Sequence, residues 1–261
     1  SATAGKSSKQ ALWGNDPSSP WALRDVSLTV RRGEFLGLAG HTGSGKSTTL
    51  YATLGDVARP EINIITVEDP VEFRMRGINQ VQVNNKAGMT FAAALRSILR
   101  ADPDVVLIGE IRDQETANIA IEASLTGHLV LSTLHTNDAP SAVTRLTEMG
   151  VEPFLLSSSL AAVMAQRLAR RLCKKCKRQD TATEAELRTL GVPHMPDTPL
   201  PTIWRPVGCR ECANTGYSGR VAIQQVMGVD STMEDLIARG ATSIDIDKAA
   251  KEQGMTTLRK D

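Results

Sequence analysis

Aromatic residues are scarce in this chain of 261 residues, at 3% of the composition. A protein that binds single-stranded nucleic acid usually stacks the bases on such side chains. The formal net charge is only +1, so the overall charge does not indicate a nucleic-acid-binding protein either. These two features predict that nucleic acid is not a partner.

Long apolar runs are missing as well. No run approaches the roughly 18 residues that identify a membrane-spanning helix, and the first residues lack the charged-then-apolar order of a signal peptide. The hydrophobic content of 41% and the charged content of 23% are ordinary for a globular protein. We therefore expect a globular protein without a membrane span.

Cysteine is limited to four residues, which form two Cys-x-x-Cys pairs, Cys173 with Cys176 and Cys209 with Cys212. Without an export signal, such pairs indicate metal binding before disulfides. Four thiolates at these spacings suit tetrahedral Zn²⁺ and leave no open coordination position, so the predicted zinc site is structural. The alternative is two buried or redox-active pairs.

The hydrophobic pattern predicts an α/β fold. Solid apolar runs alternate with helical spacing, as in a parallel sheet that helices cover on both faces. The expected strands are residues 24–30, 34–39, 62–67, 105–108 and 129–133. The expected helices are residues 46–54, 91–100, 113–124 (with Asp113 as its N-cap), 139–149, 153–172, 183–190, 233–239 and 244–253.

Local changes in composition along the sequence also predict how the chain is divided into domains. Residues 1–20 are rich in Ser, Gly, Pro, Asn and Lys, and the four cysteines follow only after residue 172. We expect a loose leader at 1–20, an α/β core at 21–172, a tetracysteine zinc subdomain at 173–215 and a mostly helical C-terminal part of the core at 216–261.

A glycine-rich loop follows the predicted strand at 34–39 and precedes a predicted helix. Its pattern, Gly40-x-x-x-x-Gly45-Lys46-Ser47, in this context predicts a phosphate-binding P-loop. Backbone N–H groups and the helix start would bind the phosphates of ATP, Lys46 would reach the β- and γ-phosphates, and Ser47 would bind Mg²⁺. The predicted site comprises Gly40, His41, Thr42, Gly43, Ser44, Gly45, Lys46, Ser47 and Thr48.

Acidic residues follow two of the predicted strands. Glu110 follows the strand at 105–108, in the Walker B pattern with Glu in place of Asp, and Glu68 follows the strand at 62–67. In an open α/β sheet, ligands bind at the carboxyl ends of the strands. One acid could hold Mg²⁺ through water and the other could orient the attacking water, in an order that the sequence leaves open. His135 follows the strand at 129–133 and is a third candidate.

These motifs resemble, in order, those of the ATPases of type II secretion and type IV pilus assembly, the GspE-like and PilB-like secretion ATPases. The resemblance covers residues 40–260 and implies a RecA-like P-loop NTPase core. The stretches that carry it are 43–51 (GSGKSTTLY), 66–72 (TVEDPVE), 95–104 (LRSILRADPD), 109–113 (GEIRD) and 126–137 (TGHLVLSTLHTN).

The resemblance also implies roles for individual residues. Glu68 and Glu110 match the acidic pair of the active site, and His135 matches a histidine near the γ-phosphate. Arg112 is expected to take part in catalysis, since Arg pairs bidentately with phosphate or carboxylate. The family also carries a tetracysteine insert. Further arginines match positions around the nucleotide and the subunit boundaries: Arg96, Arg100, Arg145 and Arg220.

The function that the resemblance implies is ATP hydrolysis by a ring-forming motor, expected to be a hexameric homo-oligomer. Its motion would drive pseudopilin or pilin subunits out of the inner membrane, with type II secretion favoured. The motor would be cytoplasmic and peripheral at the inner membrane, docked on platform proteins of the secretion or pilus system. A neighbouring subunit's arginine is usually needed at the transition state.

Two alternatives remain open. Residues 21–39 resemble the start of an ABC-transporter ATPase, which works as a two-subunit ATP sandwich, although no Leu-Ser-Gly-Gly-Gln signature follows. The chain could also be an assembly module that holds ATP with little turnover of its own. We expect that it lacks the family's preceding domain and last helices, and Gln224 and Gln225 stand where the family usually has Tyr-Glu.

Overall fold

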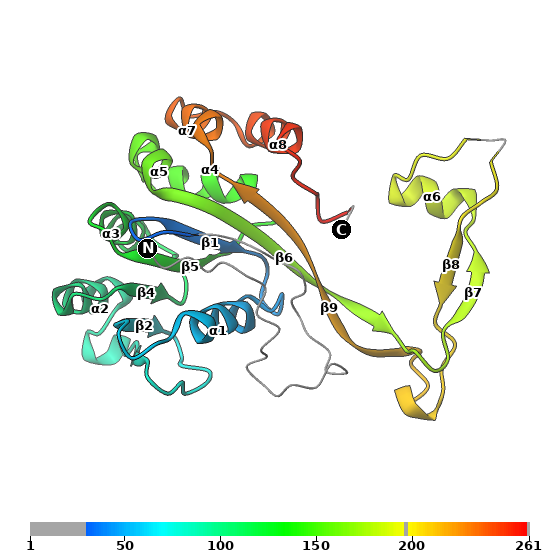
Figure 1. Ribbon diagram of the computed structural model, residues 1–261, viewed down its shortest axis with the longest axis horizontal. Helices are drawn as coiled ribbons and strands as arrows, with labels where there is room; N and C mark the ends of the chain where they lie inside the picture. The colour runs from blue at the N-terminus through cyan, green and yellow to red at the C-terminus, as the bar shows by residue number, and fades with distance from the viewer. Residues whose placement is uncertain (1–29, 196–197, 260–261) are drawn as a thin grey trace.

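The computed structural model describes residues 30–195 and 198–259 of the chain. An α/β core contains most of the elements, and an arm that holds the cysteines extends from it (Figure 1). The predicted leader at 1–20 lies outside the described residues, as does the predicted strand at 24–30 apart from Val30.

The core is built on a seven-stranded sheet of order β3-β2-β4-β5-β1-β6-β9. All neighbouring strands pair in parallel except β6 and β9, which are antiparallel. The mainly parallel sheet that the apolar runs predict is therefore confirmed. The strands are β1 (Phe35–Ala39), β2 (Ile64–Glu68), β3 (Asn79–Gln82), β4 (Val105–Ile108), β5 (Leu129–Leu134), β6 (Leu160–Leu172) and β9 (Tyr217–Gly228).

Apolar side chains cover both faces of the sheet because successive strand residues point to opposite sides. Phe35 of β1 belongs to the cluster on one face, and Leu36 belongs to the cluster on the other. The second face is covered by α1 (Lys46–Val57). The first face carries α2 (Phe91–Ile98), α3 (Gln114–Leu125), α4 (Pro140–Glu148), α5 (Pro153–Ser159), α7 (Ser231–Ala238) and α8 (Ser243–Glu252).

Several helices begin where the sequence supplies a capping side chain. The carboxylate of Asp113 accepts a hydrogen bond from the backbone N–H of Thr116, which confirms the predicted cap of α3. Thr90 caps α2 in the same way. Such caps satisfy N–H groups that have no partner within the helix.

The predicted helix at 153–172 is wrong beyond Ser159. The chain leaves α5 there and continues as the strand β6, which pairs with β1 on one side and with β9 on the other. Residues such as Ala, Leu, Met and Arg favour helices, but backbone pairing on two sides overrides this weak preference. The strand β9, in a region that we predicted to be mostly helical, provides one of those two partners.

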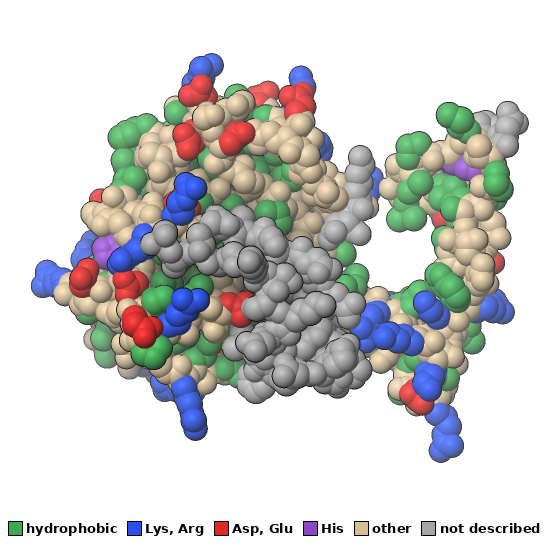
Figure 2. Space-filling view, in the orientation of Figure 1, with side chains coloured by type: hydrophobic (Ala, Val, Ile, Leu, Met, Phe, Trp, Pro, Cys, Tyr) green, Lys and Arg blue, Asp and Glu red, His purple; other side chains and the backbone are tan. Residues whose placement is uncertain are grey.

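The strands β6 and β9 continue past the rest of the sheet into the arm (Figure 1). The arm contains a two-stranded sheet and one short helix, which confirms the predicted helix at 183–190. Figure 2 shows Lys and Arg side chains gathered at the base of the arm. The elements of the arm are β7 (Arg178–Thr181), α6 (Glu184–Leu190), β8 (Thr202–Arg205) and the 3₁₀ turn η3 (Arg210–Cys212).

Among the residues that the structure describes, no helix is long and apolar enough to cross a lipid bilayer.

Candidate functional site

The glycine-rich loop joins β1 to α1, so the predicted strand–loop–helix arrangement is confirmed. Gly43 and Gly45 have positive φ angles, 81° and 86°, which glycine adopts without the strain that a Cβ would cause. No side chain caps α1. The first N–H groups of this helix therefore have no side-chain acceptor, and a helix start of this kind attracts anions.

Lys46 lies inside the loop, with 8% of its surface exposed. Its Nζ donates hydrogen bonds to the backbone carbonyl oxygens of Gly40 and of His41, the latter at 3.5 Å. Burial lowers the pKa of Lys46, and the negative charge of Glu110 opposes that shift. An amine held within the loop in this way is well placed to contact phosphate oxygens.

Ser47 lies beside a carboxylate that the sequence analysis missed. Its Oγ donates a hydrogen bond of 3.1 Å to Oε1 of Glu72, which follows β2 in the chain. A hydroxyl and a carboxylate oxygen are the kinds of ligand that Mg²⁺ prefers. The acidic run at 66–72 contained the signal for Glu72, but only folding brings it to Ser47.

Glu68, at the end of β2, is 5% exposed and fixed by three donors. Its carboxylate accepts hydrogen bonds from the hydroxyl of Tyr51, from Thr66 Oγ1 at 2.5 Å and from Gln80 Nε2 at 3.2 Å. A buried carboxylate requires such partners. Burial, together with the hydrogen bond to Glu68, raises the pKa of Tyr51 to about 12, so this hydroxyl stays protonated.

The sequence analysis did not select Tyr51 as a site residue, although a signal was present. Tyr51 lies four positions after Ser47 on α1, and residues at this spacing share one face of a helix. The Tyr51 hydroxyl also accepts a hydrogen bond of 3.2 Å from the backbone N–H of Glu72. One helix face therefore contacts Glu68 at the end of β2 and Glu72 in the loop after it.

Glu110 follows β4 and contacts two basic side chains. Its Oε2 lies 2.6 Å from Nε of Arg112 and 3.4 Å from Nε2 of His135. Burial lowers the pKa of His135, and the positive charge of Lys46 adds to this shift, so the imidazole is neutral near pH 7. The side chain of Arg112 is 70% exposed and extends toward solvent.

The backbone holds the strand ends close together. Thr133 on β5 donates through Oγ1 to the carbonyl oxygen of Gly109 at 2.7 Å. A Cβ at Gly109 would approach Cα of Glu68 to 3.3 Å, so a glycine there lets the ends of β2 and β4 pack tightly. The loop after β1, Glu68, Glu110 and His135 therefore share one edge of the sheet.

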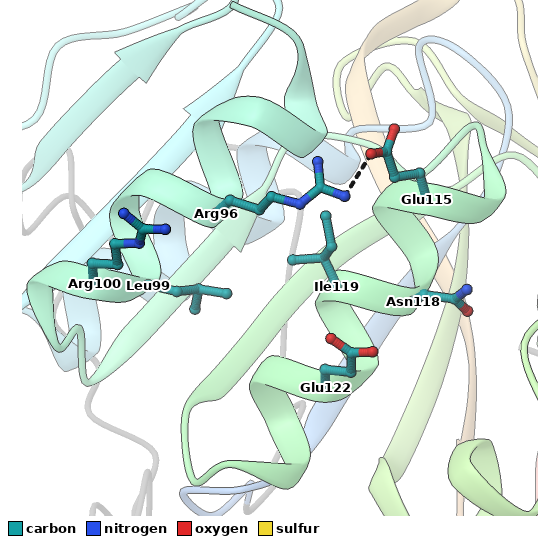
Figure 3. Close-up of a pocket in the computed structure, with 7 residues that line it drawn as sticks. All are labelled: Arg96, Leu99, Arg100, Glu115, Asn118, Ile119 and Glu122. Atoms are coloured by element: carbon teal, nitrogen blue, oxygen red, sulfur yellow. Dashed lines mark ion pairs between the residues drawn. The ribbon is translucent and has the colours of Figure 1, made fainter.

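The other four candidate arginines make different contacts. Arg96 on α2 forms an ion pair of 2.6 Å with Glu115 on α3, and Arg100 lines the same surface depression of about 460 Å³ (Figure 3). Arg145 pairs with Glu148 on α4 at 3.6 Å. Arg220 on β9 lies opposite Arg170 of β6. Their predicted roles at the nucleotide or at subunit boundaries stay predictions.

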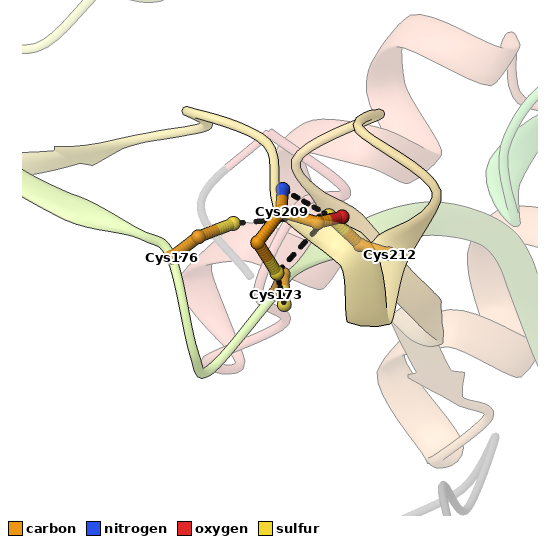
Figure 4. Close-up of side chains that lie close together, drawn as sticks. All are labelled: Cys173, Cys176, Cys209 and Cys212. Carbon is orange, nitrogen blue, oxygen red and sulfur yellow. Dashed lines mark hydrogen bonds between the residues drawn. The ribbon is translucent and has the colours of Figure 1, made fainter.

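The four cysteines come together at the base of the arm (Figure 4). Their sulfur atoms all lie within 4.8 Å of one another, and three of the pairs are 3.9, 3.8 and 3.7 Å apart. A tetrahedral zinc site with Zn–S bonds of about 2.3 Å places its sulfurs about 3.8 Å apart. The cysteine cluster could therefore hold a metal ion.

Backbone N–H groups surround the sulfurs of this cysteine cluster. Cys209 and Gly216 each donate a hydrogen bond of 3.2 Å to Sγ of Cys212, and Gly208 donates one of 3.4 Å to Sγ of Cys176. Burial opposes ionisation of Cys212, but these donors lower its pKa to about 6. Cys212 therefore favours the thiolate, which is the form that binds metals, whereas burial raises the pKa of Cys176 to about 11.

Comparison with known protein families is consistent with this site. Residues 22–261 match the family described as type II/IV secretion system protein. The chain belongs to this family. The match includes residues 22–39, the stretch that resembles the start of an ABC-transporter ATPase.

Two individual relatives are about half identical to this chain. The type II secretion system protein E of Aeromonas hydrophila is 51% identical over 86% of this chain and 44% of its own length. The type IV pilus assembly ATPase PilB of Myxococcus xanthus is 53% identical over 85% of this chain and 39% of its own length. The chain thus spans less than half the length of these two relatives.

Solved structures agree on the fold. The pilus retraction motor PilT with bound ADP superimposes with a TM-score of 0.60 at 26% identity, over 88% of this chain and 60% of that chain. The ATPase DotB of Legionella pneumophila has the same TM-score at 21% identity, over 88% of this chain and 55% of that chain. The RecA-like fold that the sequence predicts is confirmed.

Proposed function

We propose that this chain is the ATP-hydrolysing core of a motor for protein secretion or pilus assembly. The observation that carries the proposal is the shared sheet edge: the phosphate loop, Glu68, Glu110 and His135 follow four neighbouring parallel strands. Relatives named as a type II secretion protein and as a pilus assembly ATPase support it.

The phosphate loop would bind ATP through the residues from Gly40 to Thr48. Backbone N–H groups at the start of α1 would surround the phosphates, and Lys46 would neutralise charge on the β- and γ-phosphates. Ser47 and Glu72 offer adjacent oxygen atoms for Mg²⁺. When bound, Mg²⁺ stabilises the charge that develops on the phosphate oxygens.

The contacts of the two acids favour different roles. Three donors already occupy Glu68, which suits an acid that holds the loop after β2 in place. Among the described residues, Glu110 forms ion pairs with Arg112 and His135 alone, and its side chain is 13% exposed, so its carboxylate is better placed to orient the attacking water. A neutral His135 can donate a hydrogen bond from its ring N–H to the γ-phosphate.

The cysteine cluster would bind one structural Zn²⁺. Four sulfur ligands complete a tetrahedron, so no position stays open for a substrate. The spacing of the sulfurs and the N–H donors around Cys212 and Cys176 support this assignment. Zinc would hold the two halves of the arm together at its base.

The motor would work as a ring, expected to be a hexamer, with arginines at the subunit boundaries. Arg112 is a suitable residue because it is exposed beside Glu110, and Arg96, Arg100, Arg145 and Arg220 remain candidates. We expect partners among the inner-membrane components of a secretion or pilus system and a cytoplasmic, peripheral location. The names of the relatives support membrane-system partners.

Substitution of Lys46 tests the nucleotide site. We expect Lys46→Ala to weaken binding of fluorescent MgADP about 10-fold or more, because a charge-assisted contact to phosphate is lost. Lys86→Ala removes the same charge from an exposed turn and should leave binding unchanged. Equal affinity of both variants and the parent chain would rule out this loop as the nucleotide site.

A further inference from the structure

We propose that Gln166 is a positioning residue of the phosphate loop. The proposal rests on the nucleotide site proposed above. Gln166 lies on β6, is fully buried and was not selected from the sequence. Alternate residues of β6 face α1, since Ala162 and Met164 belong to the apolar cluster on that side of the sheet. Gln166 is the next residue on this face of β6 after Met164. Its uncharged polar side chain interrupts the apolar surface there.

Three hydrogen bonds fix the amide of Gln166. Its Nε2 donates to the carbonyl oxygen of Ser44 at 2.7 Å, and its Oε1 accepts from Thr49 Oγ1 at 2.9 Å. Gln224, the residue opposite on β9, donates through Nε2 to the same Oε1 at 3.2 Å. One side chain thereby joins the loop before Lys46 to the first turn of α1 after it.

The bond to Ser44 has a direct consequence for phosphate binding. A loop whose N–H groups converge on an anion must turn its carbonyl oxygens away, and a buried carbonyl needs a donor. Ser44 is buried, and Gln166 Nε2 supplies that donor. The amide therefore holds the peptide after Ser44 in the orientation that keeps the N–H groups free.

The backbone of the loop also packs closely against Gln166. A Cβ at Gly45 would lie 2.9 Å from Gln166 Nε2, and a Cβ at Gly40 would lie 2.7 Å from the Gln166 carbonyl oxygen. The loop therefore rests directly on Gln166. The neighbouring Gln225 accepts a hydrogen bond from the backbone N–H of Ala139, which follows the segment that holds His135. Gln166 and Gln225 occupy consecutive register positions of the β6–β9 pair, since Gln166 lies opposite Gln224 and Gln225 lies opposite Ala165.

Gln166→Glu tests the positioning role. The change keeps the shape but replaces the donor with an oxygen that repels the Ser44 carbonyl, so we expect the affinity for MgADP to fall about 10-fold or more. Affinity for AMP, measured by competition, should change far less, because the loop holds the outer phosphates. Gln179→Glu adds the same charge on the exposed strand β7 and should change neither affinity.

Thr49→Val is a milder second variant, in case Gln166→Glu does not fold. It removes the hydroxyl that donates a hydrogen bond to Gln166 Oε1. We expect about 3-fold weaker MgADP binding with unchanged AMP binding. If a folded Gln166→Glu binds MgADP like the parent, or loses ADP and AMP equally, the inference is overturned. If Gln166→Glu does not fold, an unchanged MgADP affinity in Thr49→Val overturns it. Lys46→Ala distinguishes a failure of this inference from a failure of the proposed function. If Lys46→Ala binds MgADP normally, the nucleotide site itself is refuted.

Discussion

The core and the arm are stabilised in different ways. Strands β1, β2, β4 and β5 are buried along their whole length, and helices cover both of their faces. The arm buries few residues, mainly Ala182, Leu187, Cys173 and Cys212. Apolar burial is the main force that stabilises folds of this size. The core can therefore fold through its own packing, whereas the arm needs additional stabilising contacts.

One of these contacts is a charged cluster around Arg205 on β8. Its guanidinium lies 2.5 Å from Asp180 on β7 and 2.7 Å from Glu186 on α6. Glu186 also completes a capping box with Thr183 at the start of α6. The other proposed contact is the metal at the cysteine cluster. Trp204, which precedes Arg205 on β8, is 47% exposed, so the arm has little apolar packing there.

Removal of the metal should change the stability of the arm relative to the core more than any other change. Treatment with a zinc chelator, or the change Cys209→Ser, should abolish hydrogen-exchange protection across 173–215, because the binding energy of the metal that joins the two Cys-x-x-Cys pairs would be lost. Protection of β1, β4 and β5 should be unchanged. Mass spectrometry of exchanged peptides measures both regions in one experiment. Loss of protection in the core strands as well would contradict the independence of the two regions.

A matched pair of leucine substitutions compares packing in the two regions. Leu146 is fully buried in the core, and Leu187 is buried in the arm. We expect Leu146→Ala to lower the global free energy of unfolding by about 2–5 kcal/mol, as for other large-to-small core changes. Leu187→Ala should leave the main thermal transition in place and increase exchange only in α6. The same shift of the main transition in both variants would show that arm and core unfold together.

Acid should destabilise the arm by breaking its ion pairs, with a smaller effect than metal removal or the leucine substitutions. Hydrogen bonds from Arg205 lower the pKa of Glu186 from its ordinary 4.5 to about 2. A folded-state pKa below the unfolded value stabilises the arm above pH 4.5, and this stabilisation is lost as the pH falls toward 2. In Arg205→Met, arm protection measured by hydrogen exchange should already be reduced at neutral pH, and acid should add less further loss than in the parent chain, because only the release of metal from protonated thiolates is common to both proteins. An identical acid profile in both proteins would rule out this ion pair as a stabilising contact.

The sequence predicted the features that depend on local patterns. Solid apolar runs identified β1, β2, β4 and β5, and the spacing of the cysteines predicted that they would lie together. Glu68 and Glu110 were found because parallel strands end at one edge. The strand β6 was missed because its residues favour a helix and only the pairing with β1 and β9 makes it a strand.

The missed site residues have a common cause. Glu72 meets Ser47, and Gln166 meets Ser44, across 25 and 122 positions of the chain. No periodicity or spacing encodes contacts over such separations. Tyr51 was the exception. It lies one helical turn after Ser47, and this spacing could have predicted that it faces the site.

Glu110→Gln gives the most direct test of ATP hydrolysis at the shared sheet edge. Phosphate release at saturating MgATP, measured beside MgADP affinity, separates chemistry from binding. We expect release to fall about 100-fold or more, because a carboxamide cannot accept the proton of the attacking water. Affinity for MgADP should change little, since Lys46 and the loop are intact. Unchanged phosphate release in Glu110→Gln would contradict the assignment of this acid to catalysis.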